Sequence, residues 1–226
     1  MHFLERYKLF LFDLDGLLVD TEILHWRAYK SVVESWGGTF DWDYPSYLVV
    51  AGKSAFSIRE KLESEQPHLF IERSWEDLYA RKKSTFLRLL SESEITLMPG
   101  VEGAMEYIAQ RGFPMVVVTH SPIQVVDAVK KLPALSPISR WISREEYSNP
   151  KPAPDGYLVA CKEFNVSPED AIGFEDAVRG VDSLLAAGCR PILINKNNDE
   201  ARQTCIARGI PVFSSFEEVV SETASI

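Results

Sequence analysis

Two aspartates, Asp13 and Asp15, stand at the end of a short apolar run and are followed at once by Gly16. Carboxylates in such a pair can divide the work of phosphoryl transfer. One can attack phosphorus as a covalent nucleophile, while the other protonates the leaving oxygen and later activates the acceptor hydroxyl. Because an Asp-x-Asp pair is also common in turns and helix caps, it predicts an active site only in company with other groups.

Further polar side chains follow later apolar runs or stand in a stiff proline-rich loop before a predicted helix. They are Thr119, His120, Ser121, Lys151, Glu175 and Asp176. Hydroxyl and ammonium groups can hold the oxygens of a transferring phosphate, and Mg²⁺ can offset the charge because it prefers carboxylate and phosphate oxygens. Each motif alone has an ordinary interpretation as a helix cap, a surface loop or a solvated acidic pair. Their order along the chain favours one shared site.

The elements that must position these groups alternate between strands and helices. Apolar stripes at helical spacing over 101–108 and 178–185 are closed by Gly112 and Gly188, a common way for helices to end. The alternation predicts an α/β fold with a doubly wound, mainly parallel sheet and a Rossmann-like core. In such sheets ligands bind beyond the carboxyl ends of the strands, where the polar groups would gather. Short apolar runs with little polar alternation predict strands at residues 7–12, 115–118, 171–174 and 191–194.

Residues 20–91 break this alternation, because they contain helical stripes and no convincing strand. One apolar stripe covers 23–36, and a second covers 75–90. A helical block between the first and second strands of an α/β domain predicts an inserted α-helical cap. The cap is expected at 20–91, and the phosphoryl-transfer core at 1–19 and 92–226.

Composition restricts the class of partner. The 226 residues include 33 acidic and 24 basic side chains, a formal net charge of −9. This balance disfavours nonspecific nucleic-acid binding, which needs basic surface, but it does not exclude a small anionic substrate held by a local cluster of Lys and Arg. Nucleic-acid binding is therefore not expected. Two further expectations, which do not come from composition, are that the chain binds a small phosphorylated metabolite and that it is a monomer.

The sequence also predicts the compartment. No apolar run approaches the roughly 18 residues needed to span a bilayer, and the N-terminus lacks the layout of a signal peptide. We therefore expect no membrane association and a cytoplasmic protein. Its three cysteines, Cys161, Cys189 and Cys205, are odd in number and widely spaced, so buried reduced thiols are expected.

At these motifs the chain resembles the haloacid dehalogenase superfamily, in the subfamily with a helical cap between its first and second motifs. Residues 12–16 resemble the first motif, Thr119 the second, Lys151 the third and 173–176 the fourth. The resemblance covers nearly the whole chain. It implies a phosphatase or phosphomutase with an aspartyl-phosphate mechanism.

The resemblance also implies individual roles. Asp13 would be the nucleophile and Asp15 the acid and base, while Thr119 and Lys151 would complete the catalytic set. Mg²⁺ would be bound by Asp13, the Asp15 carbonyl and Asp176, with Glu175 assisting.

Within the superfamily the chain is most similar to the β-phosphoglucomutase-like group. His25 follows a segment that resembles the hinge of that group, and Lys82 lies in a cap helix that resembles its substrate-phosphate lysine region. Lys53 would lie in the cap loop that reads the substrate. These residues, with His120 and Ser121, are expected to bind substrate. The alternative for His25 is a residue on the helix surface or one that packs within the cap. The alternative for Lys82 is a lysine whose stem lies along the edge of an apolar helix face while its ammonium reaches solvent.

Three functions remain open at this point. The leading one is Mg²⁺-dependent hydrolysis of a small phosphorylated metabolite, with sugar phosphates as candidates. The second is a β-phosphoglucomutase-like phosphohexomutase, which would deliver the same phosphoryl group to a sugar hydroxyl. The third is a non-catalytic phosphate-binding regulatory module. Departures from the mutase pattern at His120, Pro122 and Ala177 weaken the second function, and the presence of Asp15 argues against the third.

Overall fold

The computed structural model describes residues 3–51 and 56–224. It divides into two compact units. The α/β unit combines the described parts of Met1–Asp20 and Thr96–Ile226, and the helical unit is formed by Thr21–Ile95. None of the helices in these described ranges is both long and apolar enough to cross a membrane.

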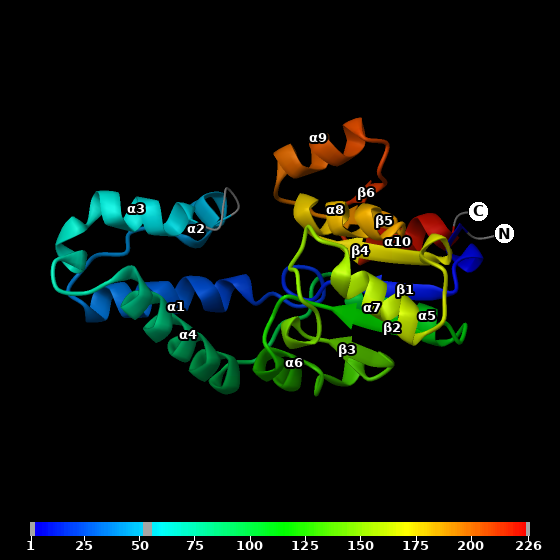
Figure 1. Cartoon of the computed structure of the whole chain (residues 1–226), viewed down its shortest axis with the longest axis horizontal. Coiled ribbons are helices and arrows are strands. Elements are labelled where there is room, and N and C mark those ends of the chain that lie inside the picture. The colour runs from blue at the N-terminus through cyan, green and yellow to red at the C-terminus, as the bar shows by residue number, and fades with distance from the viewer. Residues whose placement is uncertain (1–2, 52–55, 225–226) are drawn as a thin grey trace. The chain divides into compact units, whose positions relative to one another are not determined.

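A parallel sheet forms the centre of the α/β unit (Figure 1). Its strand order is β3-β2-β1-β4-β5-β6, and every neighbouring pair is parallel. The structure confirms the predicted doubly wound α/β fold. The strands are β1 (Leu9–Phe12), β2 (Met115–Val118), β3 (Arg140–Ile142), β4 (Ala171–Glu175), β5 (Arg190–Ile194) and β6 (Val212–Phe213).

The strand order places a switch point between β1 and β4. From β1 the chain passes to β2 and β3 on one side, and then returns to build β4, β5 and β6 on the other side. Ligands of open α/β sheets bind at such a point, beyond the carboxyl ends of the strands. The four strands predicted from apolar runs are β1, β2, β4 and β5. The short edge strands β3 and β6 were not predicted.

Successive side chains of a strand point to opposite faces of the sheet. Strands β1 and β2 are apolar on both faces, and helices cover both. Leu9 and Leu11 pack in a cluster with Tyr157 of α7 and Leu184 of α8. The ring of Phe12 instead meets Phe216 of α10 on the other face, and α10 packs on α5. The helices are α5 (Val101–Ala109), α6 (Ile123–Val129), α7 (Asp155–Glu163), α8 (Val178–Ala187), α9 (Asp199–Ala207) and α10 (Phe216–Ala224).

The end of α8 illustrates how local sequence fixes these elements. Gly188 adopts a left-handed conformation with φ of 87° at the C-cap, where a side chain would be strained. The predicted stop signal is confirmed there. All three cysteines are buried, as predicted, and the sulfurs of Cys161 and Cys189 lie 3.8 Å apart.

The helical unit is built around two long helices that lie side by side, α1 and α4 (Figure 1). Both were predicted from apolar stripes. Ser74 begins α4 with a capping box in which its hydroxyl accepts from the Asp77 amide at 3.1 Å. A core of aromatic and aliphatic side chains, including Tyr29, Leu62 and Leu78, joins the helices. They are α1 (Glu22–Ser35), α2 (Tyr44–Ala51), α3 (Ser57–Glu65) and α4 (Trp75–Glu92), with a 3₁₀ turn at Pro67–Phe70.

Candidate active site

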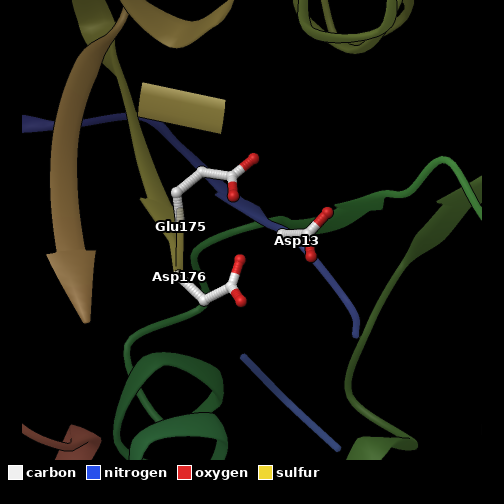
Figure 2. A group of neighbouring side chains, drawn as sticks. All are labelled: Asp13, Glu175 and Asp176. Atoms are coloured by element: carbon white, nitrogen blue, oxygen red, sulfur yellow. The ribbon is translucent and has the colours of Figure 1, made fainter. Parts of the chain in front are cut away.

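Three carboxylates meet at the switch point of the sheet. Asp13 directly follows β1, and Glu175 ends β4 beside it, because Phe12 pairs with Phe174 across the two strands. One oxygen from each of Asp13, Glu175 and Asp176 lies within 4.8 Å of the others, and the three side chains converge (Figure 2). The Asp13 amide donates to the Phe174 carbonyl at 3.1 Å, which fixes the backbone from which the Asp13 carboxylate projects.

A buried lysine joins two of these carboxylates. The ammonium of Lys151 lies 2.5 Å from Asp13 Oδ1 and 2.7 Å from Glu175 Oε1, and it donates to the Val118 carbonyl at 2.9 Å. Burial alone would lower the pKa of Lys151, but the charges of Asp13 and Glu175 raise it well above its ordinary value. Lys151 is therefore a permanent cation beneath the carboxylates.

The loop that carries Lys151 is anchored at two places. Asp155 at the start of α7 accepts from the Asn149 amide at 3.1 Å. Ser183 of α8 is buried and donates to the Ala153 carbonyl at 2.6 Å. These bonds hold the short loop against α7 and α8, so the backbone from which the Lys151 side chain extends is fixed.

Two residues that were not predicted from the sequence, Tyr157 and Gly180, hold Glu175 in place. The Tyr157 hydroxyl donates to Glu175 Oε1 at 2.5 Å, and Tyr157 is fully buried. A Cβ atom on Gly180 would lie 1.9 Å from the carboxyl carbon of Glu175, so only glycine allows α8 to approach this closely. Tyr157 reads in the sequence as one more apolar residue of a helix face, and nothing in its local pattern indicated a polar role.

The three carboxylates outnumber the two positive charges that act on Asp176, those of Arg179 and Lys151. Burial, followed by the charges of Asp13 and Glu175, raises the pKa of Asp176 well above its ordinary value. Burial also raises the pKa of Glu175 to about 7, against the opposing effect of Lys151. A site with this excess of negative charge takes up either protons or another cation.

The donor set fits a hard divalent cation. All three groups offer carboxylate oxygens, which are the ligands that Mg²⁺ prefers. Room beside Asp176 depends on Gly16, because a Cβ atom there would lie 2.5 Å from Asp176 Oδ2. Asn195, a residue that the sequence analysis did not single out, donates to the Asp176 carbonyl at 2.7 Å and fixes its backbone.

The second aspartate of the pair is held by hydroxyl groups. Ser121 Oγ and Thr119 Oγ1 donate to Asp15 Oδ2 at 2.6 and 3.2 Å. The Thr119 hydroxyl also accepts from the Ser121 amide at 3.0 Å, so it closes the local turn and orients Asp15 at the same time. The structure thus brings together the residues that follow β1 and β2.

His120 lies beside this group, next to a tyrosine that the sequence analysis did not identify. The Tyr147 hydroxyl donates to the Thr119 carbonyl at 2.9 Å, and His120 Nδ1 lies 3.3 Å from the same hydroxyl. Partial burial, followed by the charges of Arg144, Arg179 and Lys151, lowers the pKa of His120.

The predicted substrate-binding residues of the helical unit meet one another within that unit. Lys82 Nζ lies 2.6 Å from His25 Nδ1, and the ammonium is 4.8 Å from the centroid of the Tyr29 ring. The His25 imidazole stacks on Phe86 with ring centroids 4.0 Å apart. Burial and the Lys82 charge lower the pKa of His25 well below its ordinary value. Lys53 lies outside the described residues.

Comparisons with known proteins identify the family of the chain and several similar phosphatases. The family model described as haloacid dehalogenase-like hydrolase matches residues 7–188. A phosphorylated carbohydrates phosphatase of Thermotoga maritima is 28% identical over 93% of this chain and 98% of its own length. Hexitol phosphatase A of Escherichia coli is 31% identical over 87% of each chain.

A solved structure extends the comparison to a bound sugar. It is a CbbY variant from Rhodobacter sphaeroides in complex with xylulose-1,5-bisphosphate, 25% identical, with a TM-score of 0.72 over 93% of this chain and 95% of its own. The strand-end carboxylates, the buried lysine and the family match lead to one conclusion. The chain belongs to the haloacid dehalogenase-like hydrolases.

Proposed function

We propose that the chain is a Mg²⁺-dependent phosphatase of small phosphorylated carbohydrates that works through an aspartyl phosphate on Asp13. The observation that carries this proposal is the carboxylate cluster of Asp13, Glu175 and Asp176, with Lys151 paired to two of its members. Lys151 holds the Asp13 carboxylate in place and offsets its charge as an anionic substrate approaches.

The side chains of the site account for both halves of the reaction. Asp13 attacks phosphorus with a carboxylate oxygen, the bond from phosphorus to the ester oxygen breaks, and Asp15 gives that oxygen a proton. Asp15 then takes a proton from a water molecule whose oxygen attacks phosphorus, and the bond from phosphorus to Asp13 breaks. When held by Asp13, the Asp15 carbonyl and Asp176, with Glu175 assisting, Mg²⁺ would offset the charge that gathers between the carboxylates and the phosphate.

Thr119 and Ser121 keep Asp15 ready for this exchange. Both hydroxyls donate to the same oxygen, Asp15 Oδ2. Two hydrogen bonds to one oxygen orient the carboxyl group of Asp15. Asp15 can therefore give a proton in the first half-reaction and take one in the second from a fixed position.

The class of substrate is proposed from the relatives. The phosphatases of Thermotoga maritima and Escherichia coli reported above are named for phosphorylated carbohydrates and hexitols. Their matches span most of both chains, so the likeness extends beyond the catalytic motifs.

Turnover of a panel of sugar and polyol phosphates tests the proposal. Phosphate release should stop in EDTA and return with Mg²⁺. Asp13→Asn should lower kcat by about 10³-fold or more, since the nucleophile is lost. Asp127→Asn changes an exposed carboxylate of α6 and serves as the matched control. Unchanged Mg²⁺-dependent turnover in Asp13→Asn would overturn the mechanism.

The same panel separates hydrolysis from the mutase alternative. β-Glucose 1-phosphate is supplied with a trace of glucose bisphosphate, and both free phosphate and isomerised sugar phosphate are measured. Phosphate release supports the phosphatase. Isomer without free phosphate would replace it with the mutase.

A further inference from the structure

A chain of two hydrogen bonds leads from the backbone of Thr119 to His120. The Tyr147 hydroxyl lies 2.9 Å from the Thr119 carbonyl oxygen and 3.3 Å from His120 Nδ1. The tyrosine ring is wedged against α7, because a Cβ atom on Gly156 would lie 3.2 Å from Tyr147 Cε1. Glycine at position 156 thus leaves room for the ring in the position from which the hydroxyl meets both partners.

Tyr147 is also fixed from its own side of the chain. It follows a 3₁₀ turn at Arg144–Glu146 that is closed by a capping box between Ser143 and Glu146. The Glu146 carboxylate accepts from the Ser143 amide at 3.0 Å and pairs with Arg140 of β3. The capping box and the ion pair therefore hold the turn from which the Tyr147 side chain extends.

The number of protons available decides how the two bonds are made. A neutral phenol has one proton, and a carbonyl can only accept, so the bond to Thr119 uses the Tyr147 proton. The Tyr147 oxygen then presents a lone pair to His120. Contact at 3.3 Å is favourable only when Nδ1 carries hydrogen. If Nδ1 carried no hydrogen, the Tyr147 hydroxyl would have to donate to it. The Tyr147 and Thr119 oxygens would then lie 2.9 Å apart with no hydrogen between them.

This arrangement fixes the other ring nitrogen as an acceptor. In a neutral imidazole with hydrogen on Nδ1, Nε2 holds a lone pair. Burial and the nearby charges of Arg144 and Arg179 lower the pKa of His120, which favours the neutral ring. A phosphate dianion offers only acceptors and gains nothing from such a nitrogen. A hydroxyl group can donate to it.

We propose that Tyr147 is a positioning residue that sets the tautomer of His120, and that His120 Nε2 accepts a hydrogen bond from a hydroxyl of the substrate. The ligand class is a phosphate monoester with hydroxyls on its non-transferring part. The inference rests on the proposed function, since it takes the phosphate to bind at Asp13. Phe12 pairs with Val117, so Asp13 follows β1 beside the end of β2 that leads into Thr119 and His120. It assigns His120 to the sugar or polyol portion and not to the phosphate.

The tautomer is tested by NMR without any turnover. The ¹⁵N and ¹H correlations of the imidazole rings at neutral pH are recorded for the whole protein, and His120 is assigned by its absence in His120→Gln. Hydrogen on Nδ1 in the wild type, with a shift toward Nε2–H in Tyr147→Phe, supports the inference. Hydrogen on Nε2 in the wild type, or the same tautomer in Tyr147→Phe, would overturn it.

Hydroxyl recognition is tested by pairs of substrates that differ in one hydroxyl, such as glucose 6-phosphate and 2-deoxyglucose 6-phosphate, taken around the sugar. For one position the wild type should prefer the hydroxyl form by about tenfold or more in kcat/KM, because a deoxy analogue leaves the acceptor unpaired. The ratio should fall toward one in His120→Leu. It should be partly regained in His120→Gln, whose amide oxygen can accept.

The two readouts distinguish this inference from the proposed function. Identical ratios in the wild type and His120→Leu for every pair would overturn hydroxyl recognition even if hydrolysis is rapid. Failure of the wild type to hydrolyse any phosphate monoester would overturn the phosphatase, and with it hydroxyl recognition, while the NMR result would still decide the role of Tyr147.

Discussion

Within the described residues, each unit holds a buried lysine against a titratable group, and the two settings differ. In the α/β unit Lys151 lies 2.5 Å from Asp13 and 2.7 Å from Glu175. In the helical unit Lys82 lies 2.6 Å from the imidazole of His25 and above the ring of Tyr29. Both side chains are buried, so their surroundings control their charge and that of their partners.

The two settings have opposite effects on the charge of the groups in them. Carboxylates raise the pKa of Lys151, so its positive charge belongs permanently to the site. The excess carboxylate beside it raises the pKa of Asp176 and favours a second cation. In the helical unit burial and Lys82 instead lower the pKa of His25, so the pair keeps its imidazole neutral. The α/β unit therefore concentrates charged groups at one place, whereas in the helical unit burial and the charged Lys82 keep His25 neutral.

The largest effect is expected from Lys151→Met. It leaves Asp13 and Glu175 buried without their cation, which costs about 3–5 kcal/mol when one partner of a buried pair is removed. Urea denaturation should show this loss of unfolding free energy, and turnover should be abolished. Lys162→Met is the control, since Lys162 is exposed on the same helix as Tyr157. Equal stability of Lys151→Met and Lys162→Met would show that Lys151 does not stabilise the buried carboxylates.

Asp176→Asn tests the excess charge. Mg²⁺ at about 100 times its Kd should stabilise the wild type by about 2.7 kcal/mol, because a ligand that binds only the folded state shifts the equilibrium. The variant should lose this shift, and in EDTA it should be more stable than the wild type, since one of the three clustered carboxylates is gone. Thermal unfolding with and without Mg²⁺ gives both values. Glu169→Gln, at an exposed carboxylate, should keep the full shift.

Lys82→Met should have a smaller effect than Lys151→Met. Loss of a hydrogen bond made by a charged group costs about 1.5–3 kcal/mol, and methionine keeps most of the apolar stem. The pKa of His25 should rise toward its ordinary value, because one of its two causes is removed. An NMR titration of His25 measures this change. An unmoved pKa would show that Lys82 has no electrostatic influence on the imidazole.

The smallest effect is a pH dependence of the helical unit. His25 has a lowered pKa when folded, so below about pH 6.5 the unfolded chain binds a proton that the folded chain does not. Stability is therefore fully present above that pH and falls as the pH decreases. In His25→Gln the dependence should flatten.

Fluorescence can report this dependence on the helical unit alone. Four of the five tryptophans, Trp26, Trp36, Trp42 and Trp75, belong to that unit, so Trp141→Phe removes the remaining signal. Unfolding in this background is followed at several pH values. A stability that rises as the pH falls from 7 to 5 would contradict the account of His25.

The sequence predicted those parts of the fold that are determined by continuous local patterns. The apolar runs of β1, β2, β4 and β5 are buried on both faces, and each carries its own signal. The edge strands β3 and β6 have only three and two residues. Such short segments become strands by pairing with their neighbours, and this information is not local.

The same distinction applies to the site. Asp13, Thr119, Lys151 and Glu175 stand at strand ends or before a helix, so the rule for open sheets predicted that they would meet. Tyr157 and Tyr147 reach their partners Glu175 and Thr119 across 18 and 28 residues. Their contacts arise from the packing of α7 and of a turn, and neither tyrosine carries a local mark of its role.

The central claim is that Asp13 carries the phosphoryl group. Its most direct test is an acid quench of the Mg²⁺-bound enzyme during turnover of a sugar phosphate, followed by tryptic mapping of residues 9–27, which contain Asp13, Asp15 and Asp20. One added phosphoryl group is expected on Asp13 in the wild type and none in Asp13→Asn. A phosphoryl group on another residue, or rapid turnover with none trapped at any quench time, would contradict it.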